Sequence, residues 1–118
     1  MTSVLVLKKE WLDAIVDGDK RMEIRGSSTR KVGQVIYLMA SKTDEIVARA
    51  KVSACIGPMT EDFFLEAVAY HKSPSTKLPY KKTFGWMLED VERLPQPIHH
   101  KRKQGCIGFS VYHPPLLE

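Results

Sequence analysis

Hydrophobic and polar positions divide the chain into short segments with two different periods. Six segments alternate with the two-residue period of a β-strand or are continuously apolar and rich in β-branched residues. They cover residues 3–9, 21–25, 34–42, 45–57, 83–95 and 106–114. The centre of 83–95 also accommodates a helix, but the alternation around it favours a strand.

Two further segments follow the helical period. In residues 9–17, the side chains of Trp11, Leu12, Ile15 and Val16 share one stripe, and Gly18 stands where a glycine commonly ends a helix. In residues 60–72, Thr60 is a suitable N-cap. The residues of this second helix expected to face inward are Phe63, Phe64, Ala67 and Val68.

The order of predicted elements is strand, helix, three strands, helix and two strands. Strands dominate and the helices are short, which favours an α+β fold. We therefore expect a small barrel of about six strands, mixed or antiparallel, with two short helices packed on it. No repeat, linker or low-complexity segment interrupts residues 1–118, so we expect a single domain. Residues 73–82 and 96–105 are predicted loops.

The composition is ordinary for a globular domain, with 43% hydrophobic and 27% charged residues among 118. Eighteen basic and fourteen acidic residues give a net charge of +4, which favours an anionic partner. We expect no membrane span and no signal peptide, hence an intracellular protein, cytoplasmic or, in a eukaryote, nuclear. Cys55 and Cys106 are expected to be buried free thiols, and neither a metal site nor a cofactor is predicted.

The segment GDKRMEIRG, residues 18–26, carries most of the candidate chemistry. Alternation places Arg21, Glu23 and Arg25 on the face opposite the apolar Met22 and Ile24. From composition alone, this face is a solvated charge ladder more often than a binding site. The alternative is one wall of a cleft, toward which Lys20 could also lean. Such a lysine, glutamate and arginine suit an amide, a nucleobase edge or a phosphate.

The same segment resembles a known family. LVLKKEWLDAIVDGDKRMEIR is similar to the opening of the ASCH domain, a branch of the PUA-like superfamily. The family's pattern G-x-K-x-x-E-x-R is complete here as Gly18, Lys20, Glu23 and Arg25. FGWMLEDVERLPQPI and GCIGFSVY resemble two later parts of the family. The resemblance implies a six-stranded PUA-like barrel, a cleft lined by this strand, and RNA or nucleotides as partners, and it favours the cleft-wall interpretation.

Family members differ in activity. Some small ASCH proteins are amidohydrolases that deacylate N4-acetylcytidine with a lysine, a threonine and a glutamate. Lys20 matches that lysine, Glu23 stands in the threonine's place, and no acid follows the second predicted helix until Glu89. Other members bind nucleic acid, and ribonuclease activity is attributed to some. We therefore favour a module that binds RNA, single-stranded nucleic acid or a nucleotide. The alternatives are a hydrolase with Lys20 and Glu23 as catalytic residues, and a protein-interaction adaptor.

Further candidates lie outside this strand. Ser27, Ser28 and Arg30 follow it in a loop that could hold an anion, although a plain loop is nearly as probable from sequence. Trp86 is either core or a surface on which a base stacks. The basic cluster near the end either contacts phosphates or is simply solvated; its residues are Lys101, Arg102 and Lys103. Its neighbours His99 and His100 lack the third ligand that a metal site requires.

Overall fold

The computed structural model describes residues 2–101 and 109–112. Its strands are β1 (Thr2–Leu7), β2 (Met22–Arg25), β3 (Val35–Ala40), β4 (Glu45–Ile56), β5 (Phe84–His99) and β6 (Phe109–Tyr112). Its helices are α1 (Lys9–Val16), α2 (Glu61–Glu66) and α3 (Val68–His71). The α+β class and the six strands are as predicted, and the described part of the chain has three short helices instead of two.

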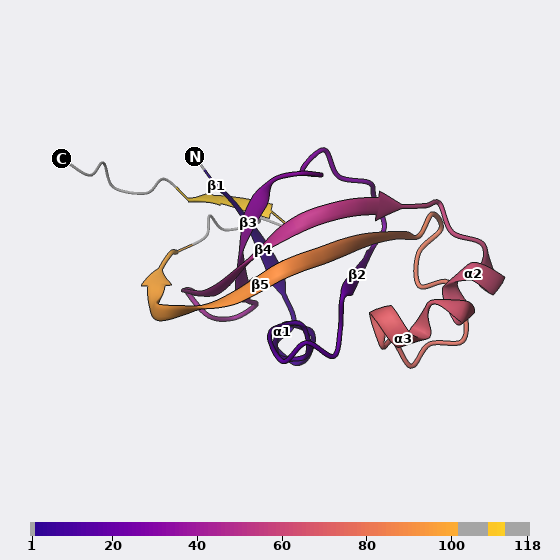
Figure 1. Ribbon diagram of the computed structural model, residues 1–118, viewed down its shortest axis with the longest axis horizontal. Helices are drawn as coiled ribbons and strands as arrows, with labels where there is room; N and C mark the ends of the chain where they lie inside the picture. Colours follow the sequence, from indigo (N-terminus) through magenta and orange to yellow (C-terminus); the bar gives the residue numbers. More distant parts are fainter. Residues whose placement is uncertain (1, 102–108, 113–118) are drawn as a thin grey trace.

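The six strands form one mixed sheet in the order β2–β5–β4–β3–β1–β6. β1 pairs with β3 in parallel, and the other neighbours are antiparallel. Figure 1 shows the long strands β4 and β5 running side by side, with α1 below their middle and α2 and α3 beyond one end. The sheet is curled into a half-barrel, with α1 packed against it. The predicted barrel is therefore close to the observed shape.

β5 is longer than the sequence indicates, because it continues through part of the predicted loop 96–105 to His99. The pairing of β5 with β4 shifts register between Ile46 and Ala48, whose partners are Ile98 and Arg93. The intervening bulge contains Pro95 and Pro97, which cannot donate ladder hydrogen bonds. The predicted strand ended at Pro95, whereas β5 continues past both prolines through this bulge.

The predicted helix 60–72 is two helices, because the chain leaves helical geometry at Ala67, where φ is −87° and ψ is 9°. The expected N-cap is confirmed: the Phe63 N–H donates to the Thr60 hydroxyl at 3.1 Å. The expected inward face is partly wrong. Phe64 and Ala67 are buried, but Phe63 and Val68 are 42% and 48% exposed. Phe63 is turned by about 100° from Phe64 around the axis of α2, and Val68 lies beyond the break at Ala67.

The core consists of apolar clusters on both faces of the sheet. α1 ends as predicted, with Gly18 at φ +88°, and packs Leu12 and Ile15 against the sheet. A second cluster around Met39 covers the other face, and a third packs Phe64 of α2 and Ala67 against Met22 of β2. Cys55 is a free, half-buried thiol, less buried than expected, and Cys106 lies outside the described residues. No helix within 2–101 and 109–112 could cross a membrane.

Candidate functional site

β2 separates apolar from charged side chains in the way its alternation predicts. Met22 is 2% exposed and packs with Phe64, and Ile24 is partly buried in the same cluster. Glu23 and Arg25 point away from that cluster. Both are withdrawn from solvent, with 7% and 20% of their side chains exposed. A solvated charge ladder therefore does not describe this face.

Lys20, Glu23 and Arg25 form one ionic network. The Arg25 Nε donates to the Glu23 Oε2 at 3.0 Å, and the Lys20 Nζ lies 3.7 Å from the Glu23 Oε1. The Arg25 Nη2 also donates to the carbonyl oxygen of Val6 in β1 at 2.8 Å. The guanidinium is thus fixed in two directions at once, which holds its plane in one orientation.

Lys20 is more deeply enclosed than its position before β2 suggests, since it is 2% exposed. Its Nζ donates to the carbonyl oxygen of His71 at 2.6 Å and lies 4.8 Å from the centre of the Trp11 ring. Its own N–H is bonded to the carbonyl of Ala14 rather than to a strand. Strict alternation therefore does not apply to Lys20, and its side chain is able to reach the same side as Glu23.

Burial dominates the electrostatics of the network. It raises the pKa of the Glu23 carboxyl, and the charges of Arg25 and Lys20 oppose this shift. It lowers the pKa of the Lys20 ammonium, and the charge of Glu23 opposes that shift. Buried charges are costly unless they are paired and hydrogen-bonded. The network supplies these partners, and no fully buried side-chain nitrogen or oxygen among the described residues lacks one.

Arg21 does not join this network, although alternation placed it beside Glu23 and Arg25. It precedes the first residue of β2, and its guanidinium lies over the ring of Tyr70 at 4.8 Å from the ring centre. Its N–H donates to the carbonyl oxygen of Tyr70 at 2.8 Å. Because these contacts tie it to α3, Arg21 connects this helix to the sheet.

Trp86 lies next to the network on β5, directly opposite Glu23. Its ring centre is 5.8 Å from the Arg25 Cζ, and its indole N–H donates to the carbonyl oxygen of Ser27 at 3.0 Å. Only 4% of Trp86 is exposed, so it supports Arg25 from within the fold. Ser28 is exposed in the loop after β2.

The remaining candidates lie on the surface or beyond the described residues. Arg30 and Lys101 are exposed, as is Ser27. Arg102 and Lys103 fall in the segment that the structure does not describe. Within the described ranges, no three His, Cys, Asp or Glu residues are grouped in a way that could hold a metal ion.

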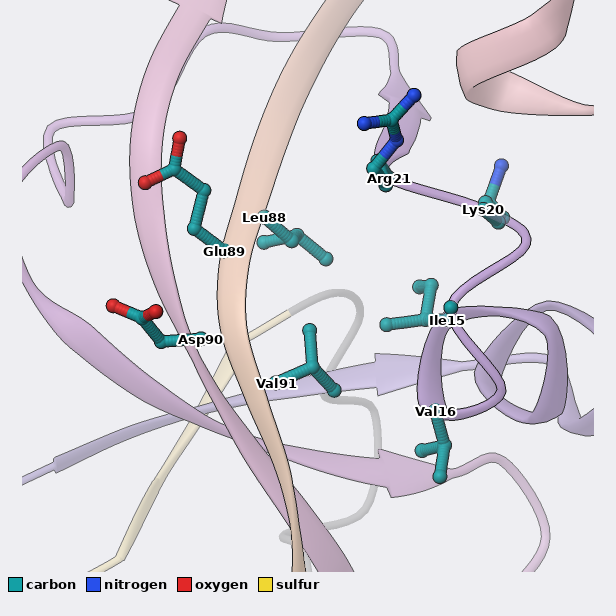
Figure 2. A pocket seen from close by; sticks show the side chains of 9 residues that line it. Ile15, Val16, Lys20, Arg21, Leu88, Glu89, Asp90 and Val91 are labelled. Atoms are coloured by element: carbon teal, nitrogen blue, oxygen red, sulfur yellow. The ribbon is translucent and has the colours of Figure 1, made fainter.

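A cavity of about 400 Å³ lies between α1 and β5. Figure 2 shows Ile15 and Val16 facing Leu88 and Val91, with Lys20 and Arg21 at one end. Glu89 and Asp90 extend from the other side of the β5 ribbon. The cavity's volume is within the range of roughly 300–1,000 Å³ that is typical of small-molecule sites. Of the three residues in the ionic network, Lys20 alone is among those lining it.

Sequence reasoning missed two members of the site. Trp11 was placed on the apolar stripe of the first helix and given no role at the site, yet it is half-buried and its ring faces the Lys20 ammonium. His71 was not singled out, yet it is completely buried and its carbonyl binds Lys20. A histidine at the end of a helix whose last turn is otherwise apolar and aromatic was the only signal for the second.

Comparisons with known proteins agree with this fold. The ASCH domain family model matches residues 5–104. The crystal structure of ASCH from Zymomonas mobilis superimposes with a TM-score of 0.71 at 17% identity, covering 83% of this chain and 73% of that one. A serine-to-alanine mutant of the same protein gives 0.71 at 18% identity, with the same coverage. A search of curated proteins gave no match. The half-barrel and its α+β class match the fold of these ASCH proteins, and the chain belongs to the ASCH domain family.

Proposed function

We propose that this protein is a nucleic-acid-associated ASCH domain that binds RNA, single-stranded nucleic acid or a nucleotide beside the Lys20–Glu23–Arg25 network. The observation that carries the proposal is the state of Arg25. A guanidinium has five N–H donors. Arg25 uses one on Glu23 and one on Val6, so three have no partner among the described residues. A fixed guanidinium at the edge of a buried network suits planar, bidentate binding of a phosphate or a base edge.

The three charged residues differ in how a ligand would meet them. Arg25 is the most accessible and would make the first contact. Lys20 lines the cavity between α1 and β5, which offers a base-sized ligand an approach to it. Glu23 accepts from Arg25, and a small displacement would allow it to accept from an amino group of a base instead.

The surroundings of the network support an anionic ligand. The net charge of the chain is +4. Exposed Ser27, Ser28 and Arg30 follow β2 directly and could bind phosphate oxygens. At the far end of β5, we propose that Lys101, Arg102 and Lys103 contact phosphates, although only Lys101 is within the described residues.

The test is binding of a short single-stranded RNA, the DNA of the same sequence and a nucleotide, measured by calorimetry. Arg25→Gln should weaken binding by roughly tenfold or more, the scale of a lost hydrogen bond to a charged group. Arg49→Gln is a matched control, because Arg49 also pairs with a glutamate, Glu92, but on the exposed surface of β4 and β5. Equal affinities of Arg25→Gln and Arg49→Gln for these ligands would reject the proposal, provided that circular dichroism shows both variants to be folded.

A hydrolase that uses the same network is the second candidate. The observation in its favour is the opposite pKa shifts of the two buried partners, raised for Glu23 and lowered for Lys20. Shifts of this kind bring acids and bases toward neutral pH and are common in active sites. We would incubate the protein with N4-acetylcytidine and with RNA and follow product by chromatography. Turnover that falls by about 10²–10⁴ in Glu23→Gln, with affinity retained, would favour the enzyme over the binding module.

A further inference from the structure

Tyr80 is an aromatic side chain held at the surface on a fixed backbone. The residue is 46% exposed. The Tyr80 N–H donates to the Thr83 hydroxyl at 3.3 Å, and that hydroxyl donates to the Tyr80 carbonyl at 3.0 Å. Thr83 is completely buried, and its carbonyl accepts from the Met59 N–H at 2.8 Å. The chain beneath the ring is therefore tied to the core while the ring remains in solvent.

The Tyr80 ring lies against the backbone that leaves the ionic network. A Cβ added to Gly26 would be 3.0 Å from the Tyr80 Cδ1 and 3.2 Å from its Cγ, so glycine is what allows this close approach. Gly26 directly follows Arg25 and precedes Ser27, whose carbonyl accepts from the indole of Trp86. Tyr80 thus stands at the outer edge of the Lys20–Glu23–Arg25 network.

The two loops that meet at Tyr80 and Gly26 are entirely free of acidic residues. Residues 72–83 contain four lysines and residues 26–33 contain Arg30 and Lys31, with no Asp or Glu in either segment. Lys81 and Lys82 follow Tyr80 directly and are exposed. All fourteen acidic residues of the chain lie elsewhere in the sequence, so this surface has a positive charge well above the chain's average.

Other exposed aromatic rings in the described part of the chain are less suitable for a nucleic acid. One face of Tyr70 is covered by the Arg21 guanidinium at 4.8 Å. Phe63 follows Glu61 and Asp62 and shares a cavity with Glu66, which would repel phosphates. The charged residues next to Tyr80 are Lys81 and Lys82, in contrast to the acidic neighbours of Phe63.

Resting on the proposed function, we propose that Tyr80 is a stacking platform for an unpaired base of a single-stranded nucleic acid. Lys81 and Lys82 contact the adjoining phosphates, and the next nucleotide is directed toward Arg25. A base stacks on an aromatic ring irrespective of its identity, so the subsite selects for single strands rather than for sequence. Such stacking changes affinity by roughly five- to a hundredfold when the ring is removed.

The experiment uses a seven-nucleotide single-stranded RNA with 2-aminopurine at its centre, and the DNA of the same sequence. Binding to the full chain should quench 2-aminopurine fluorescence through stacking. Tyr80→Leu should lose this quenching and weaken binding by roughly five- to a hundredfold, whereas Tyr80→Phe, which keeps the ring, should retain both. Tyr70→Leu is the matched control, because Tyr70 is similarly exposed at 41%.

The outcomes separate the two proposals. If the wild type binds either strand but Tyr80→Leu binds and quenches like the wild type, the stacking platform is rejected while the proposed function stands. If the wild type binds neither strand, the platform fails, and the proposed function fails with it unless calorimetry shows binding of a nucleotide. Comparable losses in Tyr80→Leu and Tyr70→Leu would also reject the platform, because the effect would then not be specific to this ring.

Discussion

The Lys20 ammonium donates a hydrogen bond of 2.6 Å to the backbone carbonyl of His71, 51 residues later in the chain. This contact joins the entrance of β2 to the last residue of α3. The position of the Lys20 ammonium therefore depends on where α3 packs. Because Lys20 and Arg25 both pair with Glu23, the contact also connects α3 to Arg25. The network is therefore oriented by a packing contact between distant segments as well as by the strand that carries it.

Lys20→Met should destabilise the protein by roughly 3–5 kcal/mol, because it leaves Glu23 with fewer partners in a buried place. Methionine keeps an unbranched apolar chain of similar reach, so the change removes the ammonium group, with its charge and its hydrogen bond to the His71 carbonyl. The free energy of unfolding from urea titration is the measurement. Lys9→Met is the control, because Lys9 pairs with Asp13 at 2.7 Å in full solvent and should matter little.

The double variant Lys20→Met, Glu23→Gln tests whether the loss of stability comes from the broken Lys20–Glu23 ion pair or from altered packing around each side chain. It also removes the carboxylate that Lys20→Met leaves paired with Arg25 alone, so the double variant should be more stable than the sum of the two single changes implies. Strict additivity of the two single effects would mean that Lys20 and Glu23 do not interact energetically.

His71 should make stability depend on pH. Its Nδ1 accepts from the Ser73 N–H at 2.9 Å, so the neutral ring carries its proton on Nε2, which faces the Phe64 carbonyl at 2.7 Å. Burial lowers the pKa of His71; the Phe64 carbonyl opposes this shift and the charge of Lys20 adds to it. As pH falls below about 6.5, His71 therefore takes up a proton in the unfolded chain but stays neutral in the folded one. The free energy of unfolding should fall with pH in this range.

The contribution of His71 is the difference between the wild type and His71→Phe. The ring of His71 stacks on that of Phe64 at 4.2 Å, and phenylalanine preserves this packing without a titrating group. Glu23, with its raised pKa, acts in the opposite sense, gaining stability as pH falls, but it is present in both proteins. Urea titrations at pH 7.5, 6.5 and 5.5 should give a smaller loss for His71→Phe. If the free energy of unfolding depended on pH equally in the wild type and in His71→Phe, His71 would not be the group responsible for the loss of stability.

Local patterns in the sequence were sufficient to predict much of the fold. They failed where contacts between distant residues determine the position of a side chain or the length of a strand. The helical period of residues 9–17 correctly predicted α1, and Gly18 correctly predicted its end. The alternation of Met22 and Ile24 correctly predicted the buried face of β2. The place of Lys20 depends on His71, which no local pattern connects to it. The predicted strand stopped at residue 95, and only the pairing of β5 with β4 shows that the strand continues past a bulge that accommodates Pro95 and Pro97.

Gly57→Ala should destabilise the fold through the backbone. Gly57 has φ +146°, a conformation that L-residues rarely adopt, and a Cβ there would lie 2.8 Å from the Thr83 carbonyl oxygen. We expect a loss of about 1–3 kcal/mol or more, measured by thermal unfolding. Gly33→Ala is the control, because Gly33 also has a positive φ, +87°, but nothing lies within 4 Å of its added Cβ. Equal losses at the two positions would show that the contact with Thr83 is relieved easily.

Binding of single-stranded RNA should weaken with salt in proportion to the phosphates contacted. Each phosphate neutralised on a single strand contributes roughly −0.7 to the log–log slope of affinity against salt concentration. Four contacts, from Arg30, Lys101, Arg102 and Lys103, would contribute about −3 to the slope, and contacts from Lys81 and Lys82 would add to it. Replacing the three cations at 101–103 with glutamine should therefore flatten the slope by about 2.

The control for this last prediction removes three exposed lysines at positions not assigned to the site, namely Lys8, Lys9 and Lys51. It lowers the net charge from +4 by the same amount, so any effect of overall charge appears equally in both triple variants. A slope that flattens only in the 101–103 variant identifies these cations as phosphate contacts. A slope that is unchanged there, or that flattens equally in the control, would mean that the basic cluster after β5 is a solvated surface, because released counterions report contacts and not net charge.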